Sequence, residues 1–284
     1  MTATVATRPG GEQTPDRDRI SLRQALSDTL VITRRNLLRN VRLPQLLLFS
    51  TVQPVMFLLL FNYVFGGAIE GAVPGGFEYL QFLMPGLLIQ IAAFGAGQTA
   101  LGLTEDLQNG VIDRFRALPM ARSAVLAGRT LADLLRNAAV LSLMLVVGFV
   151  IGFRFEQGLL RFLAAFGLGL LFAYALSWVM ATIGLKVKSP EAAQSAVFLP
   201  IFPLVFASSV FLPTQTMPDW LRTFADHQPI TIVANGLRGL MLGEEALAPG
   251  ITVGGQVGLA LVWIAGITAV FSVLAVRAYR KAVV

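Results

Sequence analysis

The chain has 284 residues, of which 55% are hydrophobic and 13% charged, and its formal net charge is +6. Soluble domains carry about 25% charged residues, and a single core cannot bury this much apolar surface, so the composition excludes a soluble protein and indicates an integral membrane protein. The chain has no cysteine, which excludes disulfides, thiolate nucleophiles and cysteine-ligated metal sites.

The N-terminal region divides into two parts. Residues 1–20 lack the apolar segment of a signal peptide and are rich in polar residues, which predicts a disordered cytoplasmic tail. Residues 21–45 place leucines near one helical face and arginines elsewhere, which predicts an amphipathic interface helix on the cytoplasmic leaflet. A solvated helix without a further role is the alternative. The basic residues assigned to the interface helix are Arg23, Arg34, Arg35 and Arg39.

Residues 46–284 contain six apolar segments of roughly membrane-spanning length. The segments are Leu46–Phe65, Leu80–Leu103, Ala138–Phe153, Phe162–Leu185, Ala193–Leu212 and Val257–Val276. The third is short, and we expect it to begin near Leu131, with the Arg136 side chain extending to the membrane interface. No segment interior contains an ionisable residue, so the sequence predicts no embedded group that relays protons or coordinates ions.

The basic residues set the orientation of these spans. With both termini in the cytoplasm, 18 of the 22 Lys and Arg residues fall on the cytoplasmic side. The positive charge therefore follows membrane topology, and we do not expect nucleic acid as a partner.

The cytoplasmic loop over residues 104–129 is longer and more patterned than a simple connection. Its acidic start suits a helix N-terminus, its glycine permits a turn, and apolar and charged residues then alternate up to a proline. This pattern predicts a short helix that docks into a groove on a soluble partner, while an ordinary basic loop is the alternative. The residues assigned to this docking segment are Glu105, Asp106, Gly110, Asp113, Arg114, Phe115, Leu118, Pro119 and Arg122.

The outer region over residues 213–256 holds two apolar pieces, Met217–Ala225 and Ile230–Leu242, which are too short to cross a bilayer. We expect them to form re-entrant or interfacial half-helices before the last span. Pro200 and Pro203 predict a kink or break near the end of the fifth span.

The sequence shows no catalytic constellation. It lacks the G-x-x-x-x-G-K-[ST] phosphate loop, so we expect no ATPase activity and no cofactor in this chain. The run from Gly95 to Ala100 matches a dinucleotide fingerprint, but it lies inside a predicted span without a preceding strand, and its small residues favour close helix packing instead. A transporter driven by an ion gradient is the alternative function, and it requires a carboxylate or histidine within the membrane.

Two blocks of residues resemble the type-2 ABC exporter permeases, most closely their daunorubicin-resistance branch. The first block reads Glu105-Asp-x-x-x-Gly110-x-x-x-Arg114-x-x-x-x-Pro119-x-x-Arg122. The second reads Pro213, Met217-Pro218-Asp-Trp220-Leu221, Pro229-Ile-Thr231 and Arg238. Phe115 departs from the pattern, because many members of the family carry a smaller aliphatic residue there.

This resemblance implies an all-α membrane protein of the bacterial cell (inner) membrane, with both termini in the cytoplasm. It implies two permease chains, either a homodimer or a pair with a sister permease, working with two copies of a separate ATPase subunit that binds ATP and Mg. The docking segment would hold the coupling helix, and the interface helix would also touch the ATPase. The outer half-helices would close the exit, and the residues assigned to this gate are Pro213, Pro218, Trp220, Pro229 and Arg238.

Uncharged spans that are rich in phenylalanine indicate an apolar pathway for a hydrophobic small molecule or lipid, with aromatic faces that can also hold a cation. For each phenylalanine, lipid contact or bundle packing is the alternative. The residues assigned to the pathway are Phe57, Phe61, Phe82, Gln90, Phe94, Gln98, Gln194, Phe198, Phe202 and Phe206.

Overall fold

The structure is a computed structural model that describes residues 22–42, 44–111 and 122–282. Within these ranges the chain forms helices and no strand, which confirms the expected all-α membrane protein. The long helices are α1 (Leu22–Arg42), α2 (Pro44–Leu59), α4 (Tyr79–Gln108), α6 (Arg122–Ile151), α7 (Gly158–Gly184), α8 (Pro190–Phe206) and α11 (Val253–Ala282). Helix α2 continues through a π-helical segment, η1 (Leu60–Phe65), into the short helix α3 (Gly66–Ile69).

Five segments of the described chain are long and apolar enough to cross a membrane: Thr51–Ala72, Tyr79–Gln108, Leu126–Ile151, Gly158–Gly184 and Val253–Arg280. The fifth predicted span corresponds to α8, which has 17 residues. At 1.5 Å per residue α8 extends over roughly 25 Å, which is at the lower limit for crossing a bilayer core of about 30 Å.

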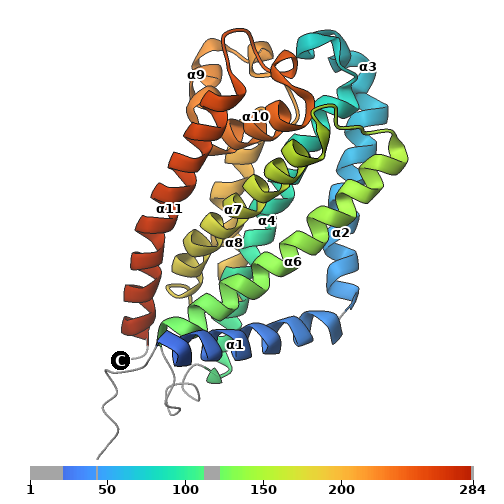
Figure 1. Cartoon of the computed structure of the whole chain (residues 1–284). Helices are drawn as coiled ribbons and strands as arrows, with labels where there is room; N and C mark the ends of the chain where they lie inside the picture. Colours follow the sequence, from blue (N-terminus) through green and yellow to red (C-terminus); the bar gives the residue numbers. More distant parts are fainter. Residues whose placement is uncertain (1–21, 43, 112–121, 283–284) are drawn as a thin grey trace, which may run out of the picture.

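The two ends of the bundle carry different elements (Figure 1). Helix α1 lies across one end, here called the α1 end, where α11 and α7 also end. The other end, the α10 end, carries η2 (Glu70–Ala72), η3 (Pro74–Gly76), η4 (Thr214–Thr216), α9 (Asp219–His227), α10 (Pro229–Leu242) and η5 (Glu244–Ala246). The segments assigned to opposite sides of the membrane therefore lie at opposite ends of the bundle.

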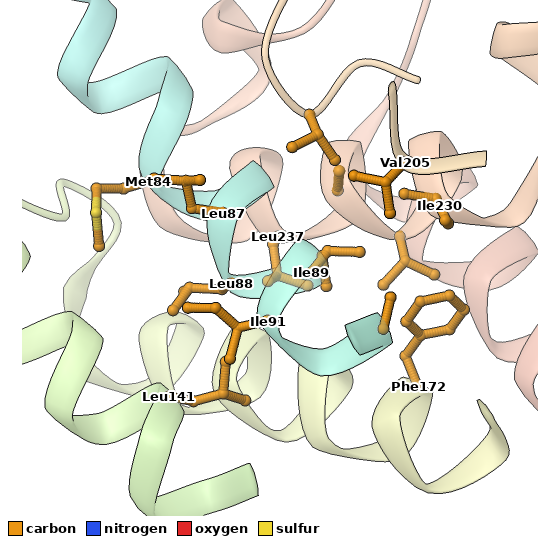
Figure 2. Close-up of a cluster of buried hydrophobic side chains, with 14 of the residues drawn as sticks. Met84, Leu87, Leu88, Ile89, Ile91, Leu141, Phe172, Val205, Ile230 and Leu237 are labelled. Atoms are coloured by element: carbon orange, nitrogen blue, oxygen red, sulfur yellow. The ribbon is translucent and has the colours of Figure 1, made fainter. Parts of the chain in front are cut away.

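Helix α4 is the centre of the bundle and packs against α2, α6, α7, α8 and α10. Figure 2 shows part of this core, in which Ile91 of α4 lies by Leu141 of α6 and Ile89 lies by Leu237 of α10. The outer faces of α2, α8 and α11 expose large apolar residues instead. This is the distribution that a membrane protein needs, because apolar side chains face lipid as well as the core.

Small residues allow close packing around α4, as the sequence predicts. A Cβ atom added at Gly97 would lie 2.6 Å from Val197 of α8, and one added at Gly148 would lie 2.5 Å from Met84. At Gly184 of α7 an added Cβ would come within 2.5 Å of the carbonyl oxygen of Ala100. The run from Gly95 to Ala100 thus serves helix contact, because a larger side chain would push these helices apart.

The predicted half-helices are present as α9 and α10, joined at Gln228. Helix α8 runs through Pro200 and Pro203 and ends at Phe206, where the amide of Ala207 donates to the carbonyl of Pro203 at 2.8 Å. The prolines therefore lie within α8, and the chain leaves the helix immediately after them.

Candidate functional site

The docking segment connects the end of α4 to the start of α6. Gly110 follows α4 with φ = 62°, a left-handed conformation that favours glycine and confirms the predicted turn. Arg122 is the first residue of α6. The central part of the segment, residues 112–121 with Asp113, Arg114, Phe115, Leu118 and Pro119, lies outside the described residues, so the docking helix stays a prediction.

Glu105 and Asp106 lie in the last turn of α4, and their expected place at a helix N-terminus is therefore wrong. A carboxylate at a helix C-terminus faces the negative end of the helix dipole, which is unfavourable without a cationic partner. Two arginines supply that charge to Asp106. Its Oδ2 lies 3.4 Å from Nη1 of Arg129, and its Oδ1 lies 3.8 Å from Nη2 of Arg35 on α1.

A charge cluster, defined as Arg35, Asp106, Arg129, Asp133 and Arg136, joins α1, α4 and α6. Asp133 is 4% exposed, and its Oδ2 accepts from Thr99 Oγ1 of α4 at 2.7 Å and from Nε of Arg129 at 3.3 Å. Its Oδ1 lies 3.9 Å from Nε of Arg136. The spanning part of α6 begins at Leu126, so Arg129, Asp133 and Arg136 lie within a spanning segment. The expectation of uncharged spans is therefore wrong.

The Arg136 side chain points into the bundle, so the expectation that it reaches the membrane interface is also wrong. Its Nη2 donates to the carbonyl of Gly95 at 2.6 Å and to Oδ1 of Asn137 at 3.4 Å, and the side chain is 10% exposed. Glycines of α4 make room for the polar groups of α6. The guanidinium of Arg129 occupies the place that a Cβ at Gly102 would take.

Asp133 is the kind of embedded carboxylate that the ion-gradient alternative requires. It lies beside two arginines and accepts a hydrogen bond from a threonine hydroxyl. The cluster therefore presents a paired, neutralised carboxylate rather than a free one. The spacing Arg-x-x-x-Asp-x-x-Arg at the start of an apolar run, which places the three residues near one helical face, is the sequence signal for it.

Most of the predicted pathway aromatics form one continuous aromatic column along α8 and α2. Adjacent ring centres are 4.3–6.4 Å apart, within the range of favourable aromatic contact. Phe198 and Phe202 are 49% and 42% exposed, so the column is open along one side. The aromatic column consists of Phe94, Phe198, Phe202, Phe206, Phe211, Phe57 and Phe61.

Phe211 is an additional member of the column. Its ring centre lies 4.4 Å from that of Phe61 in η1 and 6.0 Å from that of Phe57 in α2, so it connects both elements to the chain after α8. Phe82 lies apart from the column and is buried. Gln90 is also buried, and its Oε1 has no hydrogen-bond partner among the described residues. The side chains of Gln98 and Gln194 are exposed, and Gln194 lies one turn before Phe198 on α8.

The predicted gate residues lie at the α10 end, but they have different environments. Pro213 is buried, Pro218 precedes α9, and Trp220 on α9 is 75% exposed. Pro229 is the first residue of α10, where the missing amide proton costs no helical hydrogen bond. Arg238 is completely buried.

Arg238 fastens α10 to the turn after α8 and to the start of α4. Its Nε donates to the carbonyl of Phe82 at 2.9 Å, and its Nη1 donates to Ser209 Oγ at 2.9 Å and to Asn235 Oδ1 at 2.8 Å. Its Nη2 donates to the carbonyls of Ser209 and Val210. These acceptors surround the guanidinium, and among the residues that the structure describes no carboxylate pairs with this buried cation.

The predicted interface helix is α1, and it packs against the start of α6. Thr33 Oγ1 lies 3.2 Å from the carbonyl oxygen of Gly128, and a Cβ at Gly128 would lie 2.7 Å from Ile32. Arg34 is exposed and Arg35 pairs with Asp106, whereas the side chains of Arg23 and Arg39 lie outside the description.

Comparison with known proteins places this arrangement in context. The model of the family described as "ABC-2 type transporter" matches residues 27–242. The chain is 34% identical over 257 residues to the daunorubicin resistance ABC transporter permease protein DrrB1 of Streptomyces coeruleorubidus, which covers 90% of this chain and 87% of that protein. It is 27% identical to the probable doxorubicin resistance ABC transporter permease protein DrrC of Mycobacterium tuberculosis, with 90% of each chain covered. A putative transport permease, ycf38 of Cyanophora paradoxa, is 23% identical over 76% of this chain and 74% of its own.

Proposed function

This chain belongs to the ABC-2 type transporter family, and we propose that it is the membrane-spanning permease subunit of an ATP-driven exporter that moves hydrophobic or amphiphilic, drug-like or lipid-like compounds out of the cell. We place it in the bacterial cell (inner) membrane with both termini in the cytoplasm. The family assignment leaves the ion-gradient alternative without support.

The aromatic column is the observation that carries the proposed cargo class. It forms a wall of phenylalanine rings in contact with one another that is exposed along α8. Such a wall binds planar or acyl surfaces through apolar burial, and its ring faces also attract a cationic group. A sugar polymer would need a more polar lining.

The energy for transport comes from separate ATPase subunits, two per assembly, which hold ATP and Mg. In this proposal residues 113–118 enter a groove on the ATPase, and α1 touches the same subunit. The docking segment is well placed for this task, because it begins at the end of the central helix α4 and ends at the first residue of α6.

A second copy of the chain completes the pathway in this proposal. The aromatic column is open on one side, and a second column facing it would enclose a cargo molecule between two chains. The half-helices α9 and α10 would then close the outer exit of this space.

The decisive experiment is reconstitution of the permease in vesicles with and without its ATPase, using a fluorescent hydrophobic amine as cargo. We expect transport that requires both proteins and ATP, and that stops when the phosphate-loop lysine of the ATPase is replaced by alanine. Transport by the permease alone, driven by a pH or sodium gradient, would contradict the proposal.

A further inference from the structure

The charge cluster lies at the point where the docking segment joins the bundle. Asp106 is two residues before the end of α4, and Arg129 lies two turns after the start of α6. Both helices that flank the docking segment are therefore tied to each other next to it, and α1 is tied to the same carboxylate.

Arg129 makes the central contacts of the cluster. Its Nη1 lies 3.4 Å from Asp106, its Nη2 donates to the carbonyl of Gln98 at 3.3 Å, and its Nε donates to Asp133 at 3.3 Å. Asp133 in turn accepts from Thr99 at 2.7 Å, so α4 and α6 are connected over two helical turns. These side chains are almost completely screened from solvent, with exposed side-chain fractions of 11% for Arg129 and 5% for Asp133.

Buried charges of this kind resist separation. If α4 and α6 moved apart, Asp106 and Arg129 would lose each other within a medium of low dielectric constant, and Asp133 would lose the hydroxyl of Thr99. A buried charge that loses its partner is strongly unfavourable. Apolar packing alone tolerates sliding more easily, because it has no directional contacts. The cluster therefore favours movement of the two helices as one unit.

We propose that Asp106, Arg129, Asp133 and Thr99 form a rigid joint that transmits displacement of the docking segment into the central helix α4, and that these are positioning residues for coupling ATP hydrolysis to transport. This inference rests on the proposed function. It assigns a role to Arg129, Asp133 and Thr99, which lie outside the docking segment and outside the aromatic column.

Gly102 offers a mild way to break this joint. A methyl group at this position would overlap the guanidinium of Arg129. The atoms that must move belong to the end of a flexible side chain, so the guanidinium can be displaced without moving either helix. Gly167 on α7 is the matched control, because nothing lies within 4 Å of an added Cβ there.

The test compares Gly102→Ala with Gly167→Ala in vesicles with the ATPase, and it measures the number of cargo molecules moved per ATP hydrolysed. We expect Gly102→Ala to hydrolyse ATP but to lower this ratio by at least about fivefold, the size of a modest coupling between two sites. Gly167→Ala should keep the wild-type ratio. A variant that merely folded poorly would lower transport and permease-stimulated hydrolysis together and leave the ratio unchanged.

A second comparison asks whether the effect acts through Arg129. Contacting residues are non-additive, so Gly102→Ala should have no further effect in an Arg129→Ala background. If Gly102→Ala reduces the amount of folded permease, Arg129→Lys is the substitute, because lysine keeps the charge but lacks the planar guanidinium. The same number of cargo molecules moved per ATP hydrolysed is then measured for Arg129→Lys.

Wild-type coupling ratios in Gly102→Ala and Arg129→Lys would overturn the joint while leaving the exporter intact. A lower ratio of transport to hydrolysis in the Gly102→Ala, Arg129→Ala double variant than in Arg129→Ala alone would also overturn the joint. The methyl group at position 102 would then act on a residue other than Arg129. Failure of the wild-type protein to transport with ATP would instead reject the proposed function, so the two failures are distinguishable.

Discussion

The guanidinium carbon of Arg238 lies 3.7 Å from the centre of the Phe82 ring, so the half-helix α10 is stacked directly on the first turns of the central helix α4. The same guanidinium binds the carbonyl of Phe82 and the turn that follows α8. One buried cation therefore sets the relative positions of three elements at the α10 end.

Replacing Arg238 by alanine should destabilise the permease strongly, because each buried acceptor left without a donor costs about 1–3 kcal/mol and several lose their donor at once. Arg222→Ala is the matched control, since Arg222 is half exposed and pairs with Asp226 within one helix at 3.5 Å. Such exposed pairs contribute about 0–1 kcal/mol. The thermal unfolding midpoint in detergent is measured for both variants. Similar midpoints for the two would show that the contacts of Arg238 do not stabilise the fold.

Alanine at Phe198 or Phe202 should weaken cargo transport, because each change opens a gap in the aromatic column. We expect a loss of about 1 kcal/mol or more in cargo binding, which appears as a several-fold higher KM for transport. Leu199→Ala is the control on the same helix, because Leu199 is 77% exposed and lies outside the column. Equal effects at all three positions would indicate lipid contact rather than cargo contact.

Charge reversal at Arg114, written Arg114→Glu, and Phe115→Ala should each reduce permease-stimulated ATP hydrolysis while the permease stays folded in the membrane. The physical reason is that a docking helix needs both its apolar face and its charge to fit a groove. Hydrolysis is measured in vesicles, and membrane integration by protease protection. If both variants stimulate ATP hydrolysis as strongly as the wild type, the docking segment does not couple the permease to the ATPase.

Labelling of single cysteines should reveal the orientation, because the chain has no cysteine of its own. Gln108 and Gly71 are both exposed and lie at opposite ends of the bundle. We expect a membrane-impermeant maleimide to label Gln108→Cys from the cytoplasmic side alone and Gly71→Cys from outside alone. The opposite pattern would reverse the proposed topology.

The membrane helices and the half-helices could be predicted from the sequence because bilayer thickness imposes a length on apolar segments. Helix α10, for example, is apolar but too short to span, and the structure shows it as a half-helix before α11. The stacking of Phe198 on Phe202 also follows from their spacing of four residues, which places both on one face of α8.

The charge cluster could not be predicted in the same way, because it depends on what faces α6. Arg129 and Asp133 reduce the hydropathy of their segment, so the apolar run read from the sequence begins only at Ala138, and even the extended span that starts near Leu131 leaves Arg129 outside. Burial of Asp133 is favourable because Thr99 of α4 donates to it, and Arg129 can be buried because Gly102 of α4 leaves space for its guanidinium. Phe211 was missed for a similar reason, since it reaches Phe61 across a turn whose direction the sequence does not specify.

The fit of Arg129 over Gly102 also constrains how this sequence can diverge. A side chain at position 102 is incompatible with the guanidinium in its present place, whereas position 129 can lose its guanidinium while glycine remains. Gly102→Ala is therefore expected to disturb the bundle less once position 129 has lost its guanidinium. Whether position 102 accepts a side chain thus depends on which residue an ancestral chain carried at position 129.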